Sequence, residues 1–158
     1  MQIDLLIEQV LNGVQFGVML FLMAAGLTLI FGVMGLINLA HGSLYMVGAF
    51  ACAAVASMTG SFWLGLAASL AAAAAAGAIV EVVVVRRLYS RGHLDQVLAT
   101  FALILVFSEG TRWLFGSSPL YLNIPSALSG AVSLPGGLDY SLYRLFIIVV
   151  GIAVAAGL

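Results

Sequence analysis

The chain has 158 residues, of which 64% are hydrophobic and 7% are charged, and its mean hydropathy is +1.23. Soluble domains carry about 25% charged residues, so this composition excludes a soluble globular fold and indicates an integral membrane protein. A net charge of −1 excludes the basic surface that nucleic-acid binding requires. The single cysteine excludes a disulfide or a thiolate metal cluster within the chain.

The first apolar run, residues 10–32, is uncharged. At about 1.5 Å per residue it spans roughly 35 Å, enough to cross a bilayer core of about 30 Å. A second apolar run covers residues 36–58 and begins with polar side chains. The connection between the runs carries several glycines near residues 32–43 and predicts either a tight turn or a discontinuous helix.

A cluster of polar residues and glycines marks this connection. Polar side chains are costly in a membrane, and they usually face a bundle interior, a partner or a water-filled path. We place Asn38 and His41, which have i,i+3 spacing, on one helical face. The predicted parts of a translocation path are Gly32, Gly35, Asn38, His41, Gly42 and Ser43. The alternative is a cluster that only holds neighbouring helices together.

Two further spans are predicted at residues 62–85 and 94–116, and each carries charged residues near an end. Glu81 is expected to pair with the arginines that follow it, a proton-relay role being the alternative. Glu109 and Arg112 have the i,i+3 spacing of a helical ion pair, and we interpret them as structural charges at the far interface, a substrate-binding role being the alternative.

The segment 86–93 holds three of the five arginines, Arg86, Arg87 and Arg91. By the positive-inside rule this loop is cytoplasmic, which places the N-terminus outside the cytoplasm. The segment 117–144 holds all three prolines and is expected to be an extracytoplasmic loop.

The last apolar run, residues 145–158, is shorter than the roughly 20 residues that a membrane-spanning helix needs. We therefore expect the chain to be an N-terminal fragment that ends inside its fifth helix. The predicted fold is an all-α, polytopic transmembrane helix bundle, with about four complete spans and a truncated fifth. It forms a single transmembrane domain over residues 1–158.

Three segments carry a family resemblance. The run GLTLIFGVMGLINLAHGSLYMVGA, residues 26–49, resembles the first signature region of LivH-type permeases of branched-chain amino acid ABC importers. Residues 80–107 are similar to that family's glutamate, short arginine-rich loop and following helix, and residues 143–151 give a weaker match. Leu39 departs from the pattern, since the family more often has phenylalanine there.

The resemblance implies a permease subunit of an ATP-driven importer in the bacterial cytoplasmic (inner) membrane. Such permeases work with a second permease subunit, two cytoplasmic ATPase subunits and a periplasmic substrate-binding protein. ATP hydrolysis is expected on the partners, since the chain has no lysine for a P-loop. We expect no enzymatic activity, no cofactor, no catalytic residue and no metal site, because no catalytic motif occurs at usable spacing.

Two other functions are left open by the residues. An ion- or proton-coupled carrier or channel would use His41, Glu81 and Glu109 as titrating groups. A structural membrane subunit would use the polar cluster only for packing.

Overall fold

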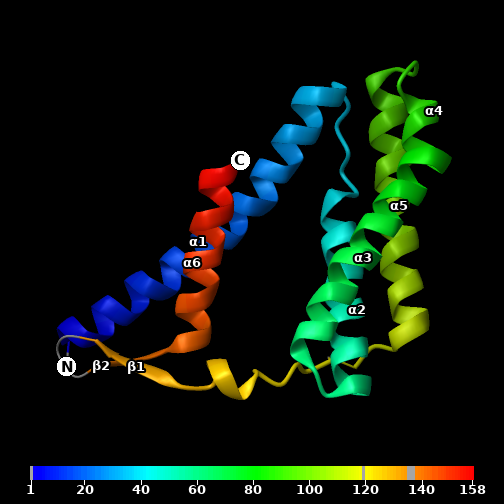
Figure 1. The fold of residues 1–158 in the computed structure, drawn as a ribbon. Helices are drawn as coiled ribbons and strands as arrows, with labels where there is room; N and C mark the ends of the chain where they lie inside the picture. Colours follow the sequence, from blue (N-terminus) through cyan, green and yellow to red (C-terminus); the bar gives the residue numbers. More distant parts are fainter. Residues whose placement is uncertain (1, 119, 135–137) are drawn as a thin grey trace. The chain divides into compact units, whose positions relative to one another are not determined.

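The computed structural model describes residues 2–118, 120–134 and 138–158, and it is helical over most of its length (Figure 1). Among these residues, four apolar helices are long enough to cross a membrane: α1 (Gln2–Met34), α2 (His41–Thr59), α3 (Phe62–Val80) with its continuation to Leu88, and α5 (His93–Phe115). A shorter apolar helix, α6 (Leu142–Gly157), follows. The predicted all-α polytopic bundle is therefore confirmed.

Helix α1 is longer than the predicted run of residues 10–32. It has 33 residues and begins at Gln2, so it extends over about 50 Å, well beyond a bilayer core of about 30 Å. The sequence of this extension contains the polar residues Gln2, Asp4 and Glu8 as well as apolar ones. Hydropathy alone missed this extension because it registers only the apolar part of a helix.

Contacts divide the chain into two compact units. The first consists of Met1–Gly26 and Ile124–Leu158, and the second of Leu27–Asn123. In the first unit, Gly151 of α6 lies against Val18 and Leu22 of α1. Arg144, one to two turns earlier in α6, contacts Asn12, which is earlier in α1. The residue numbers of the two helices rise together, so α1 and α6 are parallel.

The second unit is built on a hairpin of α2 and α3. Gly60 ends α2 in the left-handed conformation, with φ of 69°, and its N–H donates to the carbonyl of Ala56. Ser61 then caps α3, and its side chain accepts a hydrogen bond from the N–H of Leu64. This glycine and serine pair reverses the chain within two residues because each satisfies backbone groups that a helix end leaves open.

Helix α5 completes the second unit and packs on α2. The rings of Phe50 and Phe115 stack with centroids 4.9 Å apart, and the hydroxyl of Thr111 donates to the sulfur of Met46 at 3.8 Å. At its other end, α5 adds Leu103 and Phe107 to a small apolar core. These contacts make α2 and α5 parallel, with α3 antiparallel to both.

The segment 86–93, predicted as a loop, is helical at both ends. The polypeptide remains helical through a π-helical turn, η1 (Glu81–Val85), and a short helix, α4 (Arg86–Leu88). Arg86 and Arg87 are therefore on a helix, and the connection itself covers only residues 89–92 because α5 begins at His93. Straight-chain arginines are good helix formers, so the helix continues into the basic segment.

The predicted loop 117–144 contains regular structure. A single 3₁₀ turn, η2 (Ser126–Leu128), precedes strands β1 (Ala131–Leu134) and β2 (Leu138–Ser141), which pair antiparallel with Ala131 opposite Ser141. Helix α6 begins at Leu142, three residues before the predicted run. Pro119 and Pro135 lie outside the described residues.

Candidate functional site

The chain leaves helical structure between α1 and α2. Residues 35–40 are not helical, and Gly35 ends α1 with φ of 63° while its N–H donates to the carbonyl of Phe31 at 2.8 Å. This left-handed conformation is one that glycine adopts without the steric cost of a Cβ. The predicted glycine-containing break near residues 32–43 is confirmed, and the break is narrower than that range.

Side chains alternate along this break. Leu36, Asn38 and Ala40 are buried, with exposed fractions of 1%, 7% and 1%. Ile37 and Leu39 between them are exposed at 38% and 40%. A period of two is typical of extended backbone, whose successive side chains point to opposite sides. The last two residues of the break, 39 and 40, form a turn that leads into α2.

The break lies beside the end of α3. Leu44 of α2 lies near Gly77, and Leu36 packs with Val80 and Val85 in the small apolar core. Helix α2 therefore begins near the level of Val80, whereas the α3 helix continues to Leu88, about 12 Å further along its axis. The non-helical segment meets this last stretch through Leu36, which packs with Val85. Irregular backbone inside a membrane protein is tolerated where protein or a cavity surrounds it.

A cavity of about 150 Å³ opens where the break meets α3. Asn38 and Glu81, two of the residues singled out in the sequence, both line it. The rest of the lining is apolar except for one glycine: Ile30, Leu36, Leu44, Gly77, Val80 and Val85. One carboxylate and one amide in an apolar surround can hydrogen-bond a small molecule that carries a donor and an apolar body.

Glu81 begins the π-helical turn, and its carboxylate accepts a hydrogen bond from the hydroxyl of Tyr89 at 2.8 Å. Tyrosine is thus the hydrogen-bonding partner where an arginine was expected. This hydrogen bond to the carboxylate raises the pKa of Tyr89 above its ordinary value of 10.0. Single π-helical turns inside α-helices occur frequently at functional sites, and here the turn faces the cavity.

Asn38 and His41 are not on one helical face, because Asn38 precedes α2. The Oδ1 atom of Asn38 accepts from the N–H of Ala40 at 3.0 Å, and its carbonyl accepts from the N–H of His41 at 3.2 Å. The asparagine therefore shapes the turn into α2, which is the preferred use of this side chain at a helix start. The i,i+3 interpretation failed because it assumed a helix already formed at residue 38.

His41 is the first residue of α2 and does not line the cavity. Its Nδ1 atom is covered and has no hydrogen-bond partner. Ser43 is buried, and its N–H donates to the carbonyl of Ala40 at 3.0 Å. Gly32 and Gly42 are exposed and have open space where a Cβ would lie. Of the predicted path residues, only Asn38 thus reaches the cavity.

The remaining predicted charges lie away from the cavity. Arg112 and Glu109 form the expected i,i+3 ion pair at 3.4 Å, with exposed side chains. Arg86, Arg87 and Arg91 are exposed around the end of the α3 helix. They provide a positively charged rim there.

Sequence inspection missed a row of buried polar residues on one face of α5. Thr100 is fully buried and donates to the carbonyl of Gln96, while Thr111 donates to that of Phe107. Gln96 is buried too, and its Nε2 atom donates to the carbonyls of Leu88 and Arg91, which closes the end of the preceding helix. Gln96 and Thr100 are four residues apart, and Thr100 and Thr111 are eleven apart, so all three lie on one helical face. This periodicity in the sequence could have predicted the buried polar row.

A family described as "Branched-chain amino acid transport system / permease component" matches residues 9–158. The permease LivH of Escherichia coli K12, from a high-affinity branched-chain amino acid transport system, is 35% identical over 74 residues. These cover 47% of this chain and 24% of LivH. The LivH of Salmonella typhimurium is 34% identical over the same length.

BraD of Pseudomonas aeruginosa, another permease of a high-affinity branched-chain amino acid transport system, is 27% identical over 165 residues. The alignment covers 96% of this chain and 53% of BraD. The chain therefore spans about half the length of BraD and aligns with about a quarter of LivH. No solved structure matches the chain.

These relatives are transport permeases and not enzymes, and a permease component works within a larger transporter complex. Together with the four long apolar helices, they identify a multi-pass protein of the inner membrane. The family match covers nearly the whole sequence. This chain therefore belongs to the family of permease components of branched-chain amino acid transport systems.

Proposed function

We propose that this chain is a membrane-spanning permease subunit of an ATP-driven importer for branched-chain or related amino acids, and that it forms part of the translocation path. The observation that carries the proposal is the non-helical segment 36–40, whose buried residues Leu36 and Asn38 meet a π-helical turn at a cavity that Asn38 lines together with Glu81. Broken helices with irregular backbone at membrane depth are typical of substrate paths in transporters.

In this function Glu81 accepts a hydrogen bond from the passing amino acid's ammonium group, and the apolar wall contacts its side chain. Asn38 holds the turn into α2 and presents its amide to the same space. The adjoining residues of the proposed path, Gly32, Gly35, His41, Gly42 and Ser43, allow the break to change shape between outward-open and inward-open states. The exposed glycines have room for that movement.

The proposed partners are a second permease subunit, two cytoplasmic ATPase subunits and a periplasmic substrate-binding protein. ATP binding and hydrolysis on the ATPases drive alternating access. The binding protein delivers the amino acid at the outer face, where segment 117–144 is available to contact it. Membrane lipid surrounds the subunit, and no nucleic acid is involved.

The proposed orientation puts the N-terminus outside the cytoplasm, segment 86–93 inside and segment 117–144 outside. The clustering of Arg86, Arg87 and Arg91 supports it through the positive-inside rule. The parallel contacts of α1 and α6 support one part of it, the placement of the N-terminus and segment 117–144 on the same side of the membrane. Two membrane-spanning helices of one chain are parallel when an odd number of crossings separates them. Three crossings, made by α2, α3 and α5, separate α1 from α6.

The test is leucine uptake into proteoliposomes that contain the full-length permease with its partner permease, ATPases and binding protein. We expect uptake to require both internal ATP and binding protein. Glu81→Gln should lower uptake about tenfold, since a hydrogen bond to a charged group contributes roughly 1.5–3 kcal/mol. Glu109→Gln is the matched control, because Glu109 is exposed and pairs with Arg112 away from the cavity.

Each alternative makes a different prediction. A proton-coupled carrier takes up leucine with a pH gradient alone and no ATP, which would contradict the importer. If the subunit is only structural, complexes that assemble with Glu81→Gln or Asn38→Ala should take up leucine at the wild-type rate. Such a result would show that the cavity is not part of the translocation path.

A further inference from the structure

A second polar cluster lies in the first unit, where α6 begins beside α1. The guanidinium of Arg144 donates to Oδ1 of Asn12, and the hydroxyl of Tyr140 donates to the same oxygen at 3.1 Å. Tyr140 is 2% exposed, so Asn12 is held against a buried ring. Arg144 itself is exposed. The cluster therefore fixes one side of the guanidinium and leaves the rest of its donors accessible.

Arg144 differs from Arg112, the other arginine next to an apolar helical stretch on this side of the proposed topology. Arg112 has the carboxylate of Glu109 at 3.4 Å. The described side chains include no carboxylate that forms an ion pair with Arg144, whose hydrogen-bond acceptor is the neutral amide of Asn12. A cation at the edge of a membrane span without a counter-charge favours an anion from the surroundings.

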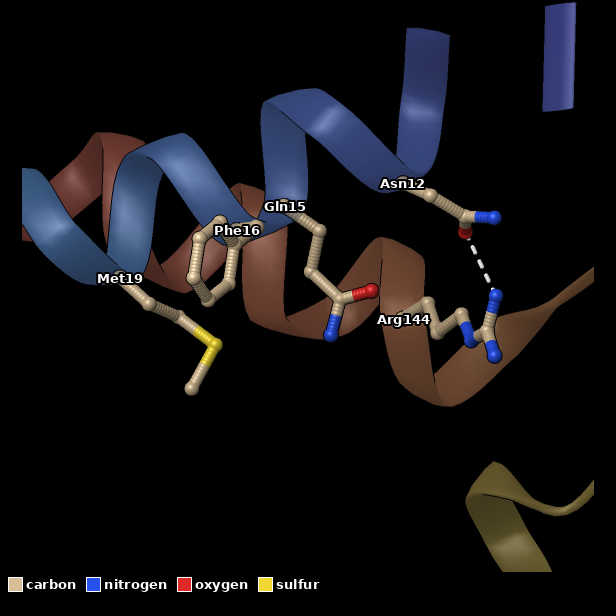
Figure 2. Close-up of a pocket in the computed structure, with 5 residues that line it drawn as sticks. All are labelled: Asn12, Gln15, Phe16, Met19 and Arg144. Atoms are coloured by element: carbon tan, nitrogen blue, oxygen red, sulfur yellow. Dashed lines mark hydrogen bonds between the residues drawn. The ribbon is translucent and has the colours of Figure 1, made fainter. Parts of the chain in front are cut away.

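An open cavity of about 350 Å³ surrounds this arginine. Figure 2 shows Gln15 and Arg144 side chains extending from α1 and α6 into it, with Phe16 and Met19 further along α1. Asn12, Phe16 and Met19 share one helical face, since their spacings are four and three. The cavity is therefore polar at the end near the loop and apolar one to two turns further into the span.

The apolar side continues beyond the cavity along the same face of α1. Leu20 and Met23 are exposed at 50% and 39%, and Phe16 at 63%. A molecule with an anionic group and a long apolar tail fits these polar and apolar surfaces. Its anionic group would contact Arg144 at the start of α6, and its tail would lie along α1. A guanidinium binds phosphate oxygens with two parallel hydrogen bonds.

We propose that the cavity of Asn12, Gln15, Phe16, Met19 and Arg144 binds an anionic phospholipid, with the phosphate on Arg144 and an acyl chain along Phe16 and Met19. The bound lipid holds the start of α6 against α1 and places a negative charge against Arg144. This site is separate from the cavity of Asn38 and Glu81, and its occupancy does not depend on the transported substrate.

The test measures retained phosphatidylglycerol by native mass spectrometry of the full-length protein released from vesicles of phosphatidylglycerol and phosphatidylcholine. Arg144→Gln should lower retained phosphatidylglycerol about tenfold, the usual scale for loss of a charge-assisted contact. Arg112→Gln is the matched control and should retain the wild-type amount, because it removes one positive charge that does not line the cavity.

A second variant keeps Arg144 and its contact with Asn12. Gln15→Glu places a carboxylate in the cavity, where it competes with the lipid phosphate, so retained phosphatidylglycerol should again fall about tenfold. Unchanged retention in both cavity variants, or equal loss in Arg112→Gln, would overturn the proposal. Displacement of the lipid by excess inorganic phosphate would also overturn it, since the site would then hold a small free anion. Displacement by leucine would overturn it too, since the site would then belong to the transported substrate.

Discussion

The two ends of the α2–α3 pair are packed in opposite ways. Toward the Gly60 turn the helices touch closely through small residues, and a Cβ built on Gly65 would lie 2.7 Å from the carbonyl oxygen of Cys52. At the other end the non-helical break precedes α2, and α3 is followed by a π-helical turn. A cavity lies between the break and this turn. One hairpin thus contains a tightly packed half and a half with irregular backbone.

This difference shows how a membrane protein keeps irregular backbone in place. Apolar burial provides little driving force between helices in lipid, so close van der Waals contact between small residues holds them together. Gly48 continues the close contact toward the break, where its Cβ would lie 3.0 Å from Oγ of Ser69. The tightly packed half therefore positions the α3 surface that the break covers, and the break is free to carry polar groups.

The largest loss of stability is expected from Gly65→Ala, which adds a methyl group in the tightly packed half. The new methyl group would contact the backbone of Cys52, which has no flexible end that could move aside. Forcing an extra carbon into a packed site costs about 1–3 kcal/mol. The thermal unfolding midpoint of the purified protein should fall accordingly.

Gly77→Ala on the same helix is the matched control for Gly65→Ala. Its Cβ would meet the side chain of Leu44 at 3.7 Å, an ordinary contact, so the free energy of unfolding should stay within about 0.5 kcal/mol of wild type. Equal losses in the two variants would mean that helix packing is uniform along α3, and the comparison between the two halves would fail.

An intermediate loss of stability is expected from Asn38→Ala, which removes a hydrogen bond in the half with irregular backbone. The variant loses the side-chain acceptor of the Ala40 N–H, a loss that costs about 1 kcal/mol at a helix start. The measurement is the unfolding midpoint together with amide exchange at Ala40. Asn123→Ala, at an exposed asparagine, should change neither quantity. Wild-type exchange at Ala40 in Asn38→Ala would show that another interaction shapes the break.

The break itself could be predicted from the sequence, but its form could not. Glycines and polar residues inside an apolar run signal interrupted helix, and Gly35 has the left-handed conformation that such a signal implies. Whether Asn38 lies on a helix or in an extended turn depends on the fit of Leu36 against Val80 and Val85, which are more than forty residues away in the sequence. Local patterns contain no information on such a contact.

The same limit applies to the rest of the candidate site. The run of valines from Val82 to Val85 gives no local reason for a π-helical turn, and the meeting of Asn38 with Glu81 depends on the register of α2 against α3. The i,i+3 pair of Glu109 and Arg112 was predictable because it needs only one helix. Interactions within one element are thus readable from the sequence, and those between elements require the packing.

The smallest effect is expected from Tyr89→Phe, which removes the hydrogen bond to Glu81 at the edge of the irregular half. The bond is exposed to solvent, so the loss of stability should be at most about 1 kcal/mol. Because this bond raises the pKa of Tyr89 above 10.0 in the folded protein, its contribution is complete below pH 10 and is lost as the pH rises through the higher folded value. Unfolding midpoints of the two proteins should therefore differ at pH 8 and converge only once the pH exceeds the raised pKa of Tyr89. A difference that persists above that pKa would mean that Tyr89 acts through packing of its ring.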